Sequence, residues 1–235
     1  MNAVTLETLQ SMATVFADAA TRPEVRVVVL SGAGRAFCAG ADLMGADVSA
    51  PSPDMIDAAN DVVSAIIEFP RPVVAAIRGP VVGVGVSLAL ACDLTIATTS
   101  SYFLLAFTKV GLMPDGGATA LVAASIGRAR ALRMALLAEK MTATEASNAG
   151  LISSVVDTED FERQLDAMVS RIATGSGRAH LRTKEAINDA TLPRLSSAFA
   201  CERRGQIELL GGVDFAEGVA AFAEKRTPNF VSREG

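Results

Sequence analysis

The sequence predicts a layered α/β fold followed by a helical C-terminal tail. Three observations support this fold class. Short β-branched runs alternate with segments of helical periodicity up to residue 156, and the pattern beyond it is wholly helical. The chain has 235 residues and is 50% hydrophobic, which is enough for one large core. Because alternating strands and helices are typical of parallel sheets with right-handed crossovers, we expect loops at the strand ends to carry any chemistry.

Two amphipathic helices are predicted on either side of the first strand. Apolar residues recur every three or four positions in residues 6–20 and 56–67, and the second helix must end before Pro70. Between them, residues 25–30 are β-branched and bounded by proline and glycine, which predicts a buried strand. The other predicted strands are residues 73–77, 94–97 and 151–156.

The tail is predicted to be a small helical subdomain. Its first helix has apolar residues at Phe161, Leu165, Met168 and Ile172, and similar stretches continue to Phe222. We expect a core with the functional site in residues 1–175 and an oligomerisation subdomain in residues 176–235. The tail has more apolar side chains than it can bury on itself, so we expect it to pack on the body or on another subunit.

Composition excludes several classes of protein. The 21 basic and 26 acidic residues are interspersed, and one Tyr and no Trp provide no stacking platform, so we expect no nucleic-acid partner. The longest uncharged apolar stretch, residues 79–92, is too short to cross a membrane. Cys38, Cys92 and Cys201 are far apart, which favours free thiols in the cytoplasm. With His180 as the one histidine, we expect no metal site.

Two glycine-rich loops follow predicted strands. Residues 31–43 read SGAGRAFCAGADL, and residues 79–88 read GPVVGVGVSL and open a predicted helix. Small residues let a backbone approach a ligand, and the N–H groups at a helix start have no acceptor within the helix. The two loops together can form an oxyanion hole. The alternatives are a flexible turn for the first loop and a dinucleotide loop for the second, but G-x-G-x-x-G is absent because Leu88 stands at its last position.

These segments resemble the crotonase family, also called the enoyl-CoA hydratase/isomerase family. The match lies in "GAGRAFCAGADL" and "GPVVGVGVSLALACDL" and continues through "KVGLMPDGGA", "IGRARALRMALLAEKMTATEASNAGLISSVV" and "EGVAAFAEKRTPNF". It implies a spiral of repeated ββα turns with a C-terminal helical trimerisation subdomain, assembled as a homotrimer or as a hexamer of two trimers. It also implies an acyl-CoA substrate and no separate cofactor, since coenzyme A is part of the substrate. Family members usually begin with another strand or two, so either the native start lies upstream or that sheet edge is reduced.

The resemblance also implies roles for individual residues. The oxyanion hole would be formed by the backbone N–H groups of Ala41 and Val84, where a side-chain change is tolerated. Phe222 and Lys225 match tail residues that approach the adenosine phosphate end of CoA, often in a neighbouring subunit; a core Phe and a solvated Lys are the alternatives. Asp42 matches a loop aspartate that we expect to hold the loop. The substrate-binding candidates are Ala39, Asp42, Leu43, Phe107, Phe222 and Lys225.

The catalytic candidate is Asp115. Hydratases of the family use two glutamates, and the matching positions here are Ser87 and Phe107, so efficient hydration is not expected. The stretch "FLLAFTKVGLMPDGG" resembles the isomerases of phenylacetate breakdown, which act on ring-epoxide phenylacetyl-CoA and on 3-enoyl-CoA esters with an aspartate at the position of Asp115. The same position holds the nucleophile of the family's 4-chlorobenzoyl-CoA dehalogenase, an outlying alternative.

A 1,3-proton shift needs one acid/base, which Asp115 can supply. Apolar neighbours such as Leu104, Leu105 and Phe107 are expected to raise the pKa of its carboxyl. The alternative interpretation is a turn aspartate, since Pro-Asp-Gly is common in turns. Asp93 is expected to be a cap or loop anchor. For the whole chain, the alternatives to an isomerase are a weak enoyl-CoA hydratase and a non-catalytic CoA-ester binder.

Overall fold

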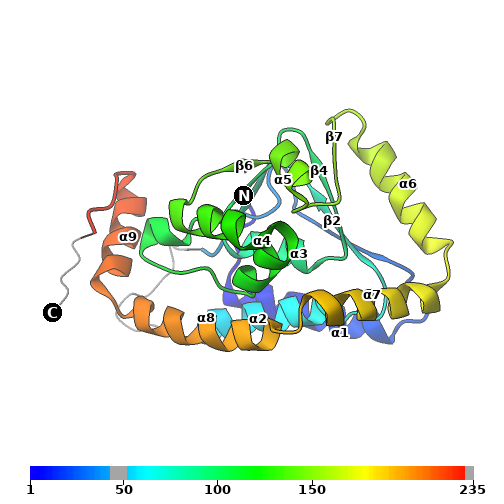
Figure 1. Cartoon of the computed structure of the whole chain (residues 1–235), viewed down its shortest axis with the longest axis horizontal. Helices are drawn as coiled ribbons and strands as arrows, with labels where there is room; N and C mark the ends of the chain where they lie inside the picture. The colour runs from blue at the N-terminus through cyan, green and yellow to red at the C-terminus, as the bar shows by residue number, and fades with distance from the viewer. Residues whose placement is uncertain (43–51, 231–235) are drawn as a thin grey trace.

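The computed structural model describes residues 1–42 and 52–230 (Figure 1). Helices alternate with short strands up to β7 and then continue alone to the end of the described chain. The helices are α1 Leu6–Thr21, α2 Asp54–Ile67, α3 Val84–Ala91, α4 Ala118–Leu137, α5 Ala143–Ala149, α6 Phe161–Ala173, α7 Gly177–Thr191, α8 Leu195–Leu210 and α9 Val213–Glu224, with a 3₁₀ helix, η2, at Phe107–Val110. The strands are β1 Val28–Ser31, β2 Val73–Ile77, β3 Pro80–Val82, β4 Leu94–Thr98, β5 Tyr102–Leu104, β6 Met141–Thr142 and β7 Ser154–Val156.

The strands form two sheets. One sheet is parallel with the order β1-β2-β4-β7, and Val74 of β2 pairs with Val29 on one side and Leu94 on the other. The second sheet has the order β3-β5-β6, with β3 parallel and β6 antiparallel to β5. Since β3 follows β2 after a turn at Gly79, successive strands enter different sheets, as in the predicted spiral of ββα turns.

Two strand predictions need correction. Residues 25–30 were expected to form a buried strand, but β1 starts at Val28 and lies at the sheet edge, where Val29 is 39% exposed. A β-branched run therefore marked an edge strand here, because β-branched residues suit any pleated surface. The predicted strand at residues 151–156 begins only at Ser154, although Leu151 and Ile152 before it are buried.

The main core lies between α1, α2, α3 and the sheets. α2 buries Val62, Val63 and Ile66 completely, and β2 is buried along its whole length, as expected for a strand covered on both faces. Phe16 of α1 and Phe69 after α2 meet edge to face, with ring centroids 5.5 Å apart. A second cluster lies under α6, where Leu165, Met168 and Ile172 pack against buried residues of β2 and β4.

The tail packs on the body of the same chain. α7 and α8 run along the edge of the molecule that also carries α2 (Figure 1), and Leu195 and Phe199 of α8 pack against the main core. The Nζ of Lys184 in α7 donates to Ile66 O and to Asp93 Oδ2, both at 2.9 Å. Asp93 Oδ2 also accepts from the N–H of Val73 at 2.7 Å. Asp93 is therefore an anchor that ties α7 to the start of the parallel sheet.

Burial raises the pKa of Asp93, and the neighbouring Lys184 opposes that shift. The side chain of Lys184 is only 6% exposed, so its loss would leave Asp93 desolvated without its counter-charge. We expect Lys184→Met to lower the free energy of unfolding by about 3–5 kcal/mol, measured by urea denaturation. The matched control is Arg178→Met at an exposed position of the same helix.

The double variant Asp93→Asn/Lys184→Met is expected to recover part of that loss, because it removes the charge left unpaired. A Lys184→Met protein as stable as Arg178→Met would show that the pair does not hold α7.

Candidate active site

The two glycine-rich loops lie against each other at one end of β3. Cys38 and Val81 form a parallel bridge, and the N–H of Val82 donates to Cys38 O at 2.9 Å. Gly40 and Gly83 both have positive φ, +94° and +57°, and a Cβ on Gly83 would lie 3.6 Å from the Cα of Gly40. These glycines let the two backbones turn while they remain in van der Waals contact.

This contact brings the two predicted oxyanion donors onto neighbouring segments. The N–H of Val4 donates to Gly40 O at 2.9 Å, and Val4 O accepts from the N–H of Asp42 at 3.0 Å, so the N–H of Ala41 between them points away from Val4. Val84 is the first residue of α3, and its N–H has no acceptor within the helix. The geometry is compatible with an oxyanion hole, and oxyanion binding by these two groups stays a prediction.

The loop that carries Asp115 lies next to the start of α3. It runs from Gly111, which ends η2 with φ +71°, to Gly117 before α4. A Cβ on Gly116 would lie 3.2 Å from Ser87 Oγ and 3.5 Å from a methyl carbon of Val84. Asp115 therefore adjoins the residue that provides one of the predicted oxyanion donors.

Ser87 of α3 supports the loop that carries Asp115. It is fully buried, and its hydroxyl donates to Asp115 O at 2.8 Å. Sequence comparison with the family's two-glutamate pattern suggested only that a carboxylate is missing at Ser87. The structure shows that a small hydroxyl at this place holds the backbone of the catalytic candidate.

Two residues of α8 that the sequence reading missed also hold this loop. Gln206 and Glu202 are each 1% exposed. Gln206 accepts from the N–H of Met113 at 3.2 Å and donates to Asp115 Oδ2 at 2.7 Å. Glu202 accepts from the N–H of Gly117 at 2.7 Å. The available signal was a helical stripe of four residues in which two polar members interrupt an apolar face: Leu195, Phe199, Glu202 and Gln206.

The pKa of Asp115 is raised to about 7. Burial of the carboxyl is the main cause, the hydrogen bond from Gln206 opposes it, and the charge of Glu202 adds to it. Leu104, Leu105 and Phe107 are buried as the sequence suggested, and the raised pKa agrees with that expectation. Asp115 as a whole residue is partly exposed, whereas its carboxyl is buried.

The remaining candidates are placed as follows. Phe107 is buried, and a Cβ on Gly83 would lie 3.9 Å from its ring, so it lines the same region. Ala39 is partly exposed in the first loop, and Leu43 lies outside the described residues.

Phe222 and Lys225 do not join this site within one chain. Phe222 is 56% exposed on α9, and Lys225 is exposed at the end of that helix. A core position for Phe222 is thereby excluded in the single chain. Contact of both residues with CoA in a neighbouring subunit stays a prediction.

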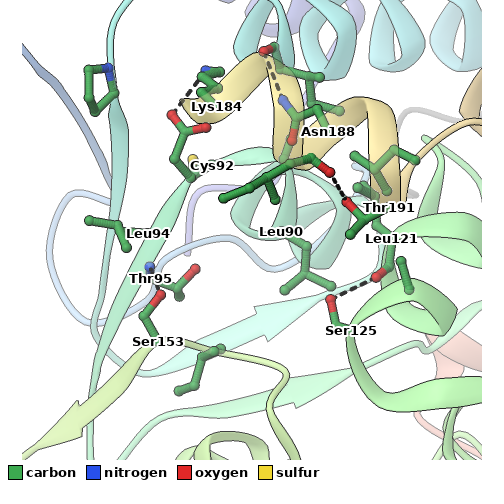
Figure 2. A pocket seen from close by; sticks show the side chains of 18 of the residues that line it. Leu90, Cys92, Leu94, Thr95, Leu121, Ser125, Ser153, Lys184, Asn188 and Thr191 are labelled. Atoms are coloured by element: carbon green, nitrogen blue, oxygen red, sulfur yellow. Dashed lines mark hydrogen bonds and ion pairs between the residues drawn. The ribbon is translucent and has the colours of Figure 1, made fainter. Parts of the chain in front are cut away.

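A separate cavity of about 580 Å³ lies between α7 and the body of the chain (Figure 2). Its polar groups are largely paired with each other. Figure 2 shows the Lys184–Asp93 ion pair and the bond from the N–H of Thr95 to Ser153 Oγ at 3.1 Å. None of the candidate site residues that the structure describes lines this cavity, so it is distinct from the site around Asp115.

Among residues 1–42 and 52–230 there is no group of three or more His, Cys, Asp or Glu side chains placed to bind a metal ion. Within the same described ranges, none of the helices combines the length and the apolar character needed to cross a membrane. Cys38 and Cys92 are buried free thiols, and Cys201 is an exposed one.

Comparison with known proteins agrees with this geometry. The sequence model described as enoyl-CoA hydratase/isomerase matches residues 1–233. A probable enoyl-CoA hydratase of Rhodobacter capsulatus is 42% identical, over 90% of this chain and 83% of its own length. The 1,2-epoxyphenylacetyl-CoA isomerase of Escherichia coli is 37% identical, over 89% of this chain and 82% of its own. The crystal structure of an enoyl-CoA hydratase from Mycobacterium avium subsp. paratuberculosis superposes with a TM-score of 0.92 at 46% identity, covering 98% of this chain and 90% of the other.

The raised pKa of Asp115 predicts a pH-dependent effect on stability. An unfolded Asp titrates near pH 4, so between about pH 4 and 7 the folded state binds more protons than the unfolded state, and the free energy of unfolding falls as pH rises. Asp115→Asn removes this contribution. We therefore expect the free energy of unfolding of the variant to rise relative to that of the wild type between pH 4 and 7. By pH 8 this relative gain should reach about 1–3 kcal/mol, measured by urea denaturation. A difference independent of pH would contradict the raised pKa.

Proposed function

The chain belongs to the enoyl-CoA hydratase/isomerase family, and within it we propose an acyl-CoA isomerase whose acid/base is Asp115. The observation that carries the proposal is that the loop of Asp115 packs against the start of α3, through Gly116 and Ser87, while the pKa of Asp115 is raised to about 7. A base works best when its pKa lies near the working pH. The positions of the two hydratase glutamates hold Ser87 and Phe107, and Ser87 is engaged with the backbone of Asp115.

The proposed reaction is a 1,3-proton shift in a 3-enoyl-CoA. Ionised Asp115 removes a proton from the carbon between the thioester carbonyl and the double bond, and the electron pair moves into the carbonyl to give a dienolate. The N–H groups of Ala41 and Val84 bind the dienolate oxygen, each contributing about 2.7–4 kcal/mol to the transition state. The neutral carboxyl then returns the proton to the far end of the dienolate, and the product is the conjugated 2-enoyl-CoA.

Enoyl-CoA hydration is the second candidate function. It is supported by the names of relatives such as the probable enoyl-CoA hydratase of R. capsulatus. Against it, addition of water needs both a positioned nucleophile and a proton donor, and the positions of the two hydratase glutamates hold Ser87 and Phe107. The carboxylate of Glu202 also lies at this loop, but it is bound to the N–H groups of Gly117 and Thr119. A non-catalytic CoA-ester binder is the third candidate.

The proposal extends to the substrate class and to the assembly. The relative that acts on 1,2-epoxyphenylacetyl-CoA suggests aromatic acyl groups and ring-epoxide chemistry as a substrate class for this chain. We also propose a cytoplasmic homotrimer or hexamer that needs no cofactor beyond the CoA of its substrate. Phe222 and Lys225 would then meet the CoA of a neighbouring subunit, consistent with their exposure on α9.

The test compares the rates of wild type and Asp115→Asn on a 3-enoyl-CoA. The rate is measured from the increase in absorbance of the conjugated product. We expect wild type to turn over and the variant to lose at least about a hundredfold in kcat, because the acid/base is gone while the shape is kept. Asp166→Asn, at an exposed position of α6, is the control and should keep full activity.

Equal rates for wild type and Asp115→Asn would refute the assignment. Loss of a 2-enoyl-CoA's conjugated absorbance in water, with no activity on the 3-enoyl ester, would favour the hydratase. Tight binding of both esters without turnover would favour the non-catalytic binder.

A further inference from the structure

The acid/base loop and α8 meet along a continuous contact. Gly117 lies directly on Phe199 and Leu195, so that a Cβ added to it would come within 2.8 Å and 2.9 Å of their side chains. At the other end of the loop, a Cβ on Gly205 would lie 2.3 Å from the sulfur of Met113. Glycines on both sides thus let the loop lie directly on the helix. Glu202 lies between these two points of α8, and Gln206 directly follows Gly205.

The chemistry of the neighbours fixes the orientation of the Gln206 amide. The backbone N–H of Met113 can only donate, so the group facing it must be the carbonyl oxygen Oε1. The amide NH₂ therefore faces Asp115 and donates to Oδ2 at 2.7 Å. A carboxyl oxygen can accept this bond both when Asp115 is ionised and when it is neutral, so the contact can persist while the proton moves.

Glu202, one turn earlier on α8, binds the other half of the loop. Its Oε2 accepts from the N–H of Gly117, and its Oε1 accepts from the N–H and the hydroxyl of Thr119. Burial raises the pKa of Glu202, and these bonds favour its ionised form. Among the described residues, Glu202 is the charged group that acts on Asp115, whereas α3 presents the non-titratable Ser87 and Val84 to the loop.

We propose that Gln206 is the positioning residue of the acid/base: its amide holds Oδ2 of Asp115 and thereby presents Oδ1 to the substrate. This inference rests on the proposed role of Asp115 and extends it to the tail. α8 is then part of the active site of its own chain, in addition to any part in assembly.

The two residues act on Asp115 in opposite directions, which separates positioning from simple support of the loop. Gln206→Met keeps the volume but removes a bond that favours the ionised carboxyl, so the pKa of Asp115 rises. Glu202→Gln removes the neighbouring negative charge, so that pKa falls. A loop that merely loosened and admitted water would move the pKa downward in both variants.

The experiment measures the pKa of Asp115 directly and through catalysis. The first readout is the pH titration of the Asp115 carboxyl carbon in ¹³C-aspartate-labelled protein, assigned with Asp115→Asn; the second is the pH profile of kcat/KM on a 3-enoyl-CoA. For Gln206→Met we expect an upward shift of about one pKa unit or more in both, and a loss of about tenfold in kcat/KM at pH 6. For Glu202→Gln we expect a downward shift. Gln10→Met and the exposed Glu208→Gln of α8 are the controls.

If the pKa of Asp115 in Gln206→Met is unchanged or lowered, the proposal is overturned. If that variant does not fold, as judged by circular dichroism, Gln206→Asn decides instead: it keeps an amide, but its side chain is one carbon shorter and loses the bond to Oδ2, so the pKa of Asp115 must rise, and an unchanged or lowered pKa would overturn the proposal. The carbon titration does not depend on turnover. An inactive wild type with an upward shift in Gln206→Met would therefore refute the proposed function and leave the positioning contact standing.

Discussion

The buried ion pair of Lys184 and Asp93 is the interaction on which the arrangement of the tail depends. Through it α7 is joined to the end of α2 and to the start of β2. Because α8 begins only a few residues after α7 ends, a fixed α7 leaves α8 little freedom. Arg203 then ties α8 to Asp57 of α2 through two hydrogen bonds, of 2.7 and 3.0 Å. The body thus determines which face of α8 meets the acid/base loop.

The carboxyl of Asp115 is held in a balance of opposing effects. Desolvation favours the neutral acid, and the Gln206 amide favours the anion. Desolvation alone would make a strong base that is seldom ionised near neutral pH, whereas full solvation would make an ionised group with little basicity. The bond from Gln206, set against burial and the charge of Glu202, gives a group that can both take and return a proton, which is what a single-residue proton shift requires.

The features predicted from the sequence are those that depend on local pattern. The strand at residues 73–77 was predicted with its observed limits, because a buried β-branched run between turn residues has few alternatives. The loop of Asp115 and its raised pKa followed from the motif and its apolar neighbours. The edge position of β1 did not, since β-branched residues serve edge and central strands alike.

The contributions of Ser87, Glu202 and Gln206 could not be predicted in the same way. Each depends on which distant segment the side chain meets, and Gln206 lies 91 residues from Asp115 in sequence. Helical periodicity identifies a buried face but not its partner. A polar residue within such a face indicates only that it has a hydrogen-bond partner. The tertiary structure is needed to identify that partner.

The docking of α8 also has a consequence for the order in which the protein becomes functional during synthesis. A nascent chain that has emerged through α7 already contains both glycine-rich loops, the parallel sheet and Asp115, and domains commonly begin to fold while translation continues. Until α8 follows, the loop at residues 113–119 has the bond from Ser87 but lacks those to Glu202 and Gln206. The acid/base is therefore fully held only after α8 has been synthesised and has packed on this loop.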